Sequence, residues 1–293
     1  MKKLLLIINP RSGKMKISEH LSSVISLFNR AGYTVESFIT EKSGDAREVV
    51  KSSGADKDLI VCAGGDGTMN EVATGLMEAD LSIPIGYIPS GSTNDFASSL
   101  GLSSDILAAT ANIISGKAHE YDLGKFGDKY FSYIASFGAF TRASYATPQS
   151  LKNTMGHMAY ILEGIKEISQ IQPYRVHMEL DGRTLEDDFL FVGICNATSI
   201  AGVLTLDKSR VDMSDGLFEV LLVRAPKSLS ELSDCINGLR YGDFDSYMVK
   251  LYRASKIEVR TTPKASWSLD GEMAPGADSI LVENLPKRLV IVH

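Results

Sequence analysis

Three loops rich in glycine, serine and threonine carry the residue types that could hold a phosphate group. They cover residues 9–14 (NPRSGK), 64–68 (GGDGT) and 89–95 (PSGSTND), and each follows an apolar run and precedes a helical pattern. Glycine lets a backbone approach an anion closely, and a helix N-terminus presents N–H groups to it. One such loop can be a plain tight turn, which is an even alternative for residues 9–13. Three such loops together indicate phosphate binding.

The second feature that could do chemistry is the carboxylate pair Asp270 and Glu272, which flank Gly271. If the preceding strand continues through them, both carboxylates lie on one face, roughly 7 Å apart along the strand. Phosphoryl transfer needs alignment, charge neutralisation and a group that accepts the proton of the attacking hydroxyl. A carboxylate can orient that hydroxyl and take its proton as the new bond forms. The alternative is an Asp-Gly surface turn with no chemical role.

Two further acidic positions have a chemical and a structural interpretation. The turn at residues 212–217 (DMSDGL) precedes a strand pattern, and its carboxylates could hold Mg²⁺ through side chains and a backbone carbonyl. A simple hairpin turn is an equally good interpretation. Asp66, inside the second glycine loop, could cap a helix or bind Mg²⁺ or a ribose.

The elements that position the glycine loops alternate between strand and helix over roughly the first 120 residues, as in an α/β domain. We expect strands at residues 4–8, 33–39, 58–62 and 83–88, and helices at 17–28, 45–51, 68–77, 94–100 and 106–114. This alternation predicts a parallel sheet, and ligands bind at the carboxyl ends of such strands. The three loops should therefore lie at one edge of the sheet.

After Asp122 the sequence becomes β-rich and indicates a mostly antiparallel domain, so we divide the chain into residues 1–122 and 123–293. Strands are expected at residues 176–180, 217–223, 256–260, 266–270, 279–282 and 289–292, with turns at 125–130 and 181–182. Helices are expected at residues 151–170 and 229–239. The first of these helices has an apolar face that could pack on the sheet or meet a lipid, formed by Met155, Met158, Ala159, Ile161, Leu162, Ile165 and Ile168.

Composition narrows the class of protein. The chain has 293 residues, 44% of them hydrophobic, and a formal net charge of −6. An acidic chain of this kind is not expected to bind nucleic acid, since phosphate backbones attract clustered Lys and Arg. Neither an export signal nor the roughly 20 apolar residues of a membrane span is visible. We therefore expect a cytoplasmic protein that would associate peripherally with the membrane if its substrate is a lipid. Whether it forms a homodimer stays open.

Two common nucleotide signatures are absent. The pattern GxxxxGK[ST] does not occur, and the dinucleotide pattern GxGxxG fails because position 70 is Asn. No carboxylate for a ribose follows in residues 85–88. A Walker-type ATPase and an ordinary NAD-dependent dehydrogenase are thus excluded. The cysteines Cys62, Cys195 and Cys235 are far apart, and we interpret them as small core residues.

The motifs together resemble the diacylglycerol kinase catalytic family, in its bacterial soluble lipid kinase branch, which is related to sphingosine kinases and more distantly to NAD kinases. The matching segments are residues 9–13 (NPRSG), 64–71 (GGDGTMNE), 91–97 (GSTNDFA), 215–217 (DGL) and 270–272 (DGE), in this order along nearly the whole chain. The glycine loop alone is shared with NAD kinases and phosphofructokinases. The later motifs favour a lipid kinase.

The resemblance implies an N-terminal three-layer α/β nucleotide domain and a C-terminal, mostly antiparallel β-sandwich domain, with catalysis between them. It implies Asp270 as the base and Glu272 as its assistant, a structural Mg²⁺ on Asp215 and the carbonyl of Leu217, and Asp212 as a third, variable partner. The substrate would be a membrane lipid at the bilayer surface. The implied ATP contacts are Asn9, Pro10, Arg11, Ser12, Gly13, Thr40, Gly65, Asp66, Gly67, Thr68, Met69, Asn70, Glu71 and Ser92.

Two alternatives to an ATP- and Mg²⁺-dependent lipid kinase stay open at this point. An NAD-kinase-like enzyme acting on a soluble substrate is supported by the shared glycine loop. A nucleotide-sensing protein without catalysis is the other, although the intact Asp-Gly-Glu segment counts against it.

Overall fold

The computed structural model describes residues 2–13, 16–139, 172–200, 204–207 and 209–293. The chain divides into two compact units, Met1–Leu123 with Pro286–His293, and Gly124–Leu285. The sequence-based boundary assigned residues 286–293 to the second domain, whereas the structure groups them with the first unit. The reason is β17 (Ile280–Val292), whose end pairs in parallel with β4 (Ile85–Pro89), with Ile291 opposite Ile85.

The first unit alternates strands and helices along the chain. Its parallel sheet has the order β2-β1-β3-β4, with the end of β17 beside β4. The elements are β1 (Lys2–Ile8), α1 (Lys16–Arg30), β2 (Tyr33–Ile39), α2 (Asp45–Ser53), β3 (Leu59–Gly64), α3 (Asp66–Glu78), β4, α4 (Asp95–Leu100) and α5 (Ile106–Ser115).

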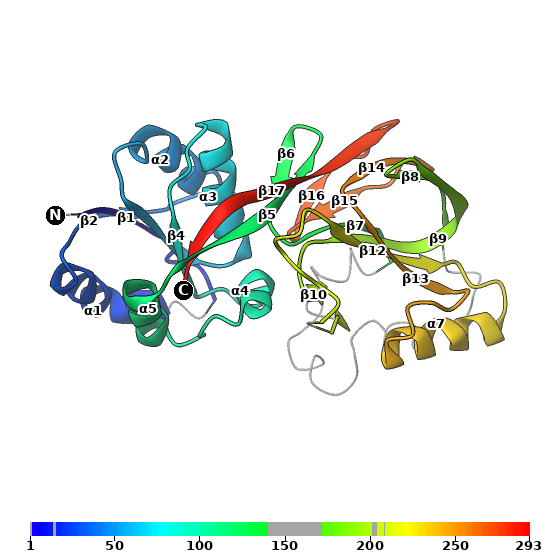
Figure 1. Cartoon of the computed structure of the whole chain (residues 1–293), viewed down its shortest axis with the longest axis horizontal. Coiled ribbons are helices and arrows are strands. Elements are labelled where there is room, and N and C mark those ends of the chain that lie inside the picture. The colour runs from blue at the N-terminus through cyan, green and yellow to red at the C-terminus, as the bar shows by residue number, and fades with distance from the viewer. Residues whose placement is uncertain (1, 14–15, 140–171, 201–203, 208) are drawn as a thin grey trace. The chain divides into compact units, whose positions relative to one another are not determined.

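Helices cover both faces of this parallel sheet, so the unit has three layers (Figure 1). On one face, α1 and α5 pack together over alternate residues of the strands, and on the other face lie α2 and α3. The last five residues of β1 are fully or almost fully buried, because a strand covered on both sides must be apolar throughout. This is why residues 4–8 read as a continuous apolar run.

The second unit is built from antiparallel pairs. Its strands follow the order β16-β15-β7-β9-β8-β14-β17, and β12 pairs with both β9 and β13. Helix α7 (Leu229–Tyr241) has Ser228 as its N-cap, and the side chain of Ser228 accepts a hydrogen bond from the N–H of Glu231. The strands are β5 (Ala118–Phe126, shared with the first unit), β6 (Lys129–Phe131), β7 (Ile134–Gly138), β8 (Tyr174–Leu180), β9 (Arg183–Cys195), β10 (Ser199–Ile200), β11 (Leu204–Thr205), β12 (Phe218–Arg224), β13 (Val249–Ala254), β14 (Lys256–Thr262), β15 (Trp267–Leu269) and β16 (Glu272–Ala274).

Two Asp-Gly pairs form two-residue hairpin turns in the second unit. Asp181 and Gly182, with φ of 47° and 87°, join β8 to β9, and Asp270 and Gly271, with φ of 49° and 89°, join β15 to β16. Positive φ at both central residues is the signature of a type I′ turn, whose twist matches that of the flanking strands. Trp267 on β15 packs edge-on against Phe126 and Phe137 and is buried in the core.

The predicted fold class is confirmed: the first unit has a parallel sheet between helices, and the second is mostly antiparallel. The turn at residues 181–182 and the helix at 229–239 are also where the sequence pattern placed them. The helix expected at residues 151–170, with its apolar face, lies outside the described residues.

Candidate functional site

The first unit brings the three glycine-rich loops to the carboxyl ends of β1, β3 and β4. Backbone bonds join two of these loops to β3: the N–H of Asn9 donates to the carbonyl of Ala63 at 2.9 Å, and the N–H of Ser90 donates to that of Gly64 at 2.8 Å. The expectation that the loops share one edge of the sheet is confirmed. Backbone geometry, more than any one side chain, therefore sets their positions.

Side chains add cross-links between the same loops. The amide of Asn9 donates to the hydroxyl of Thr68 at 2.9 Å, and the hydroxyls of Ser12 and Ser90 lie 2.7 Å apart. The buried hydroxyl of Thr40 donates to a carbonyl of β1 at 3.3 Å. Four residues of the predicted nucleotide set thus also hold the loops in place, and Ser90 is a loop contact that the sequence did not single out.

Glycine is required where two of these loops nearly touch. A Cβ atom on Gly91 would lie 2.5 Å from the Cα of Gly65, and one on Gly13 would lie 2.3 Å from the carbonyl oxygen of Ser90. Gly13 also has a φ of 53°, which disfavours other residues. A backbone surface this close and free of side chains suits the approach of an anion.

Asp66 does not cap its own helix. Its carboxylate accepts the N–H groups of Asp95 and Phe96 at 3.0 and 3.2 Å, the first turn of α4. The N-cap residue of α4, Asn94, makes no side-chain cap of its own. Asp66 therefore supplies a cap from a different loop and links the second glycine loop to the third.

Glu71 serves a second helix in the same way. Its carboxylate accepts the N–H groups of Gly44 and Ala46 at 2.8 and 3.1 Å, together with the hydroxyl of Ser43 at 3.1 Å. Gly44 is the N-cap of α2 and has no side chain with which to cap it. The carboxylate also complements the positive end of the α2 dipole.

The other residues of the predicted nucleotide set lie on these loops or in the first turn of α3. Met69 is fully buried. The rest differ in exposure: Pro10, Gly65, Gly67 and Asn70 are partly buried, whereas Arg11, Gly13 and Ser92 are exposed.

In the second unit, Asp270 is a buried turn residue rather than a strand residue. Only 5% of it is exposed, and its carboxylate accepts three successive backbone N–H groups, those of Ser132, Tyr133 and Ile134, the last two at 3.0 Å. The N–H of Asp270 donates in turn to the carbonyl of Ile134 at 2.9 Å. These bonds fix both the carboxylate and the segment that joins β6 to β7.

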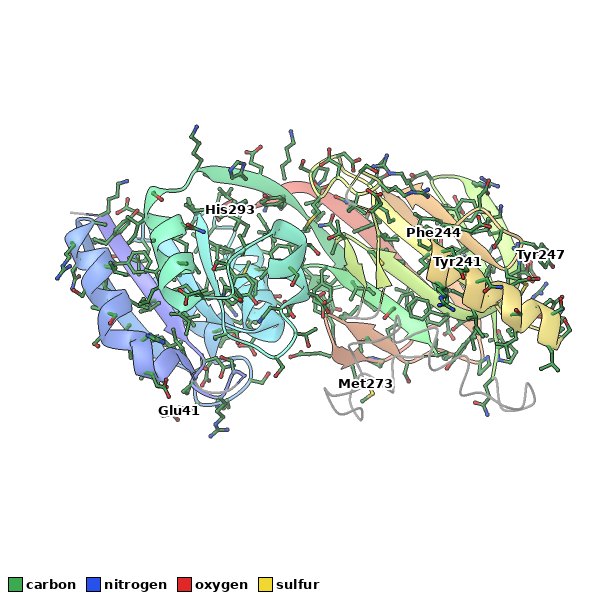
Figure 2. All side chains as sticks on the ribbon, turned by 90° about the horizontal axis from the view of Figure 1, so that it is seen from below. Glu41, Tyr241, Phe244, Tyr247, Met273 and His293 are labelled. Atoms are coloured by element: carbon green, nitrogen blue, oxygen red, sulfur yellow. The ribbon has the colours of Figure 1, made fainter. Side chains whose placement is uncertain are left out.

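The condition under which Asp270 and Glu272 would share one strand face is not met, because the strand ends at Leu269 and does not continue through them. Asp270 sits in the two-residue turn, and Glu272 starts β16 opposite Leu269. Glu272 is exposed, and the neighbouring Met273 projects outward with 76% of its surface exposed (Figure 2). The two carboxylates therefore have different environments, one buried among peptide N–H groups and one in solvent.

The acidic turn at residues 212–217 is held by hydrogen bonds of its own. Asp212 accepts the N–H and the hydroxyl of Ser214 at 3.0 and 2.7 Å, and Asp215 accepts the N–H of Leu217 at 3.0 Å. The other oxygen of Asp215 contacts the guanidinium of Arg253. Among the described residues, no group of three or more His, Cys, Asp or Glu side chains is arranged to hold a metal.

Glu219 on β12 is a buried acidic side chain that the sequence analysis did not single out. It is fully buried, and its Oε1 lies 3.3 Å from the Nε of Arg253. Burial raises the pKa of Glu219 to about 7, with Asp215 adding to the rise and Arg253 opposing it. In the sequence, the feature that could have identified Glu219 is a single charged residue inside the otherwise apolar run 217–223.

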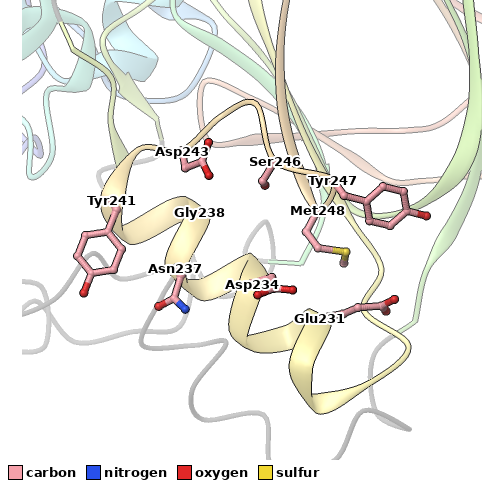
Figure 3. Close-up of a pocket in the computed structure, with 9 residues that line it drawn as sticks. All are labelled: Glu231, Asp234, Asn237, Gly238, Tyr241, Asp243, Ser246, Tyr247 and Met248. Carbon is pink, nitrogen blue, oxygen red and sulfur yellow. The ribbon is translucent and has the colours of Figure 1, made fainter.

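A cavity of about 310 Å³ lies beside α7, and none of the predicted site residues lines it (Figure 3). It is lined by Glu231, Asp234, Asn237, Gly238, Tyr241, Asp243, Ser246, Tyr247 and Met248.

The three cysteines are buried and unpaired, as predicted, and burial raises the pKa of the Cys235 thiol to about 12. No helix in the described ranges combines the length and apolar character needed to cross a membrane.

A parallel α/β unit with three glycine-rich loops at one sheet edge, together with an antiparallel unit carrying the Asp-Gly-Glu segment, defines a two-part kinase. The chain belongs to the diacylglycerol kinase family, which makes it an enzyme of the lipid kinase class. Residues 3–126 match the diacylglycerol kinase catalytic domain, and residues 134–293 match the YegS C-terminal NAD kinase beta sandwich-like domain.

Comparison of the chain with individual proteins also identifies diacylglycerol kinases as its relatives. The chain is 33% identical over 283 residues to a diacylglycerol kinase of Bacillus subtilis (strain 168), covering 94% of this chain and 92% of that protein. A Staphylococcus aureus diacylglycerol kinase (strain bovine RF122 / ET3-1) is 32% identical over 275 residues, covering 92% and 86%. A solved diacylglycerol kinase structure from Bacillus anthracis str. Sterne has the same fold, with a TM-score of 0.77, 22% identity, and coverage of 100% of this chain and 97% of that one.

Proposed function

We propose that this protein is an ATP-dependent lipid kinase that transfers the γ-phosphate to the hydroxyl of diacylglycerol or a closely related lipid at a membrane surface. The single observation that carries the proposal is the joined set of glycine-rich loops in a chain of this family. The names of the relatives support diacylglycerol as the acceptor.

The N-terminus of α3 is the proposed phosphate site of the first unit. The N-termini of α2 and α4 already receive carboxylates, from Glu71 and Asp66 respectively. At α3 the N-cap residue is Gly65, which has no side chain to fill that role. The backbone N–H groups of its first turn are therefore the natural donors to a phosphate. The adjoining Gly65–Gly91 contact carries no side chain that would block the approach of a phosphate. These features fit a nucleotide triphosphate.

The second unit supplies the carboxylates in this proposal. Asp270, fixed by three peptide N–H groups, orients the acceptor hydroxyl and takes its proton, and the exposed Glu272 assists. A group that is already held in one orientation loses little entropy when the substrate binds. Mg²⁺ bound together with the nucleotide would neutralise charge on the phosphates.

The proposal is tested by incubating the purified full chain with Mg-ATP labelled on the γ-phosphate and a panel of acceptors. Mixed micelles of detergent with diacylglycerol, a sphingoid base or phosphatidylglycerol form one arm, and NAD in solution forms the other. We expect labelled phospholipid from the diacylglycerol micelles. Labelling of NAD instead would favour the NAD-kinase-like alternative, and no labelling of any acceptor would overturn the assignment.

Replacement of Gly91 by alanine is expected to weaken ATP binding by roughly fivefold to 150-fold. The new Cβ would overlap the backbone at Gly65, so the two loops must separate, with an overpacking cost of about 1–3 kcal/mol. Calorimetric titration with an ATP analogue measures the effect. Gly32→Ala is the matched control, because Gly32 has a φ of 88° but a Cβ there meets no atom within 4 Å. Equal affinities of the Gly91→Ala variant and the wild type would contradict the phosphate site.

A further inference from the structure

An arginine occupies the acidic turn at which the family resemblance implies a structural Mg²⁺. The guanidinium of Arg253 contacts one carboxylate oxygen of Asp215 through Nη2, and its Nε lies 3.3 Å from Oε1 of Glu219. Arg253 and Glu219 stand directly opposite each other in the β12–β13 ladder. The sheet register therefore places this cation at the turn and anchors it at two points.

Further hydrogen bonds of the turn are internal. The second oxygen of Asp215 accepts the N–H of Leu217, and Asp212 accepts two donors from Ser214. These bonds already engage Oδ1 of Asp212 and Oδ1 of Asp215. Carboxylates and a carbonyl are the ligand types that Mg²⁺ takes. However, a divalent cation bound at Asp215 would share the Asp215 carboxylate with the guanidinium of Arg253. Both groups are positively charged, and two cations on one carboxylate repel each other. The residues present do not fit a metal at this turn.

We propose that the guanidinium of Arg253 is the resident cation of this turn and stands in place of the divalent metal. Its planar array of donors suits two carboxylates at once. Glu219 is part of the site: only 1% of its side chain is exposed, and its other oxygen, Oε2, has no hydrogen-bond partner within the described ranges. The fold of the second unit is then independent of Mg²⁺. This inference does not depend on which lipid is phosphorylated.

Thermal unfolding of the nucleotide-free full chain tests the proposal in three buffers that contain EDTA, MgCl₂ or MnCl₂. We expect the wild-type midpoint to be the same in all three buffers. In EDTA, Arg253→Met should melt several degrees lower, because Asp215 loses its cation and the buried Glu219 loses a hydrogen-bond donor. Arg253→Lys keeps the charge opposite Glu219 and should stay insensitive to metal, so it serves as the readout if the methionine variant does not fold.

The matched control is Arg175→Met, which removes another paired arginine of the same unit. Arg175 contacts Glu186 and Asp188 at an exposed position, so its loss should leave the midpoint almost unchanged. Two results would overturn the proposal. One is a wild-type midpoint that rises with Mg²⁺ or Mn²⁺ and loses this response in Asp215→Asn. The other is an Arg253→Met variant as stable as the wild type.

Discussion

Asp270→Asn is expected to lower the turnover number for lipid phosphorylation by about 10²–10⁴-fold, the usual contribution of a positioned proton acceptor. An amide cannot take the proton from the acceptor hydroxyl at neutral pH. ATP binding should persist, because the proposed phosphate loops belong to a different unit. Steady-state kinetics with diacylglycerol micelles and a separate ATP titration measure the two effects.

The same substitution also has a structural consequence. The carboxylate of Asp270 accepts three peptide N–H groups, and an asparagine would turn an N–H₂ group toward some of them. Leaving one or two buried donors unsatisfied costs about 2–4 kcal/mol. The midpoint of thermal unfolding should therefore fall, and turnover must be measured well below that midpoint.

Asp181→Asn is the control that separates chemistry from folding. Asp181 occupies the same position in the other Asp-Gly hairpin, and its carboxylate also accepts backbone N–H groups, from Ser255 and Lys256 at 2.9 and 2.8 Å. Asp181 is exposed, so water can satisfy the N–H groups that the substitution releases, and the variant should lower stability less than Asp270→Asn and leave turnover unchanged. If Asp270→Asn keeps wild-type turnover at a temperature at which it is folded, the assignment of Asp270 as base fails.

The two Asp-Gly hairpins also show where sequence interpretation succeeds and where it fails. Residues 181–182 lie between alternating polar and apolar residues, and that contrast marked a turn. Residues 270–271 follow buried β15, whose Trp267 and Leu269 read as a strand that could continue. The local chemistry of Asp-Gly is the same in both. The environment that buries Asp270 comes from residues 132–134, far away in the sequence.

Charged residues with long-range partners are the part of the site that sequence patterns do not predict. Asp66 and Glu71 stand in the family motif, and the pattern assigned them to a nucleotide. In the structure they cap α4 and α2, which begin 29 residues later and 26 residues earlier in the chain. The apolar runs and the glycine loops were predictable because their signals are local. Capping across elements is visible only once the sheet has brought them together.

Glu219→Gln is expected to stabilise the protein at alkaline pH and to leave it unchanged at acidic pH. Burial raises the pKa of Glu219 in the folded state to about 7, from an ordinary value of 4.5. Between these values the folded chain holds a proton that the unfolded chain releases. The stabilising contribution of this group is therefore complete below pH 4.5 and is lost as the pH rises through 7.

Glutamine has nearly the same shape as glutamate and is neutral at every pH, so the variant does not lose this stabilising contribution as the pH rises. The difference in unfolding free energy between variant and wild type should grow from near zero at pH 4 to roughly 2–3 kcal/mol at pH 8. Urea unfolding at a series of pH values measures it. Glu186→Gln is the control, because the exposed Arg175 hydrogen bond lowers the pKa of Glu186 and gives a small effect of opposite sign. Unfolding free energies of wild type and Glu219→Gln that change in parallel with pH would contradict this prediction. They would show that Glu219 is ionised in the folded protein even at the lower pH values, with Arg253 and not a proton balancing its charge.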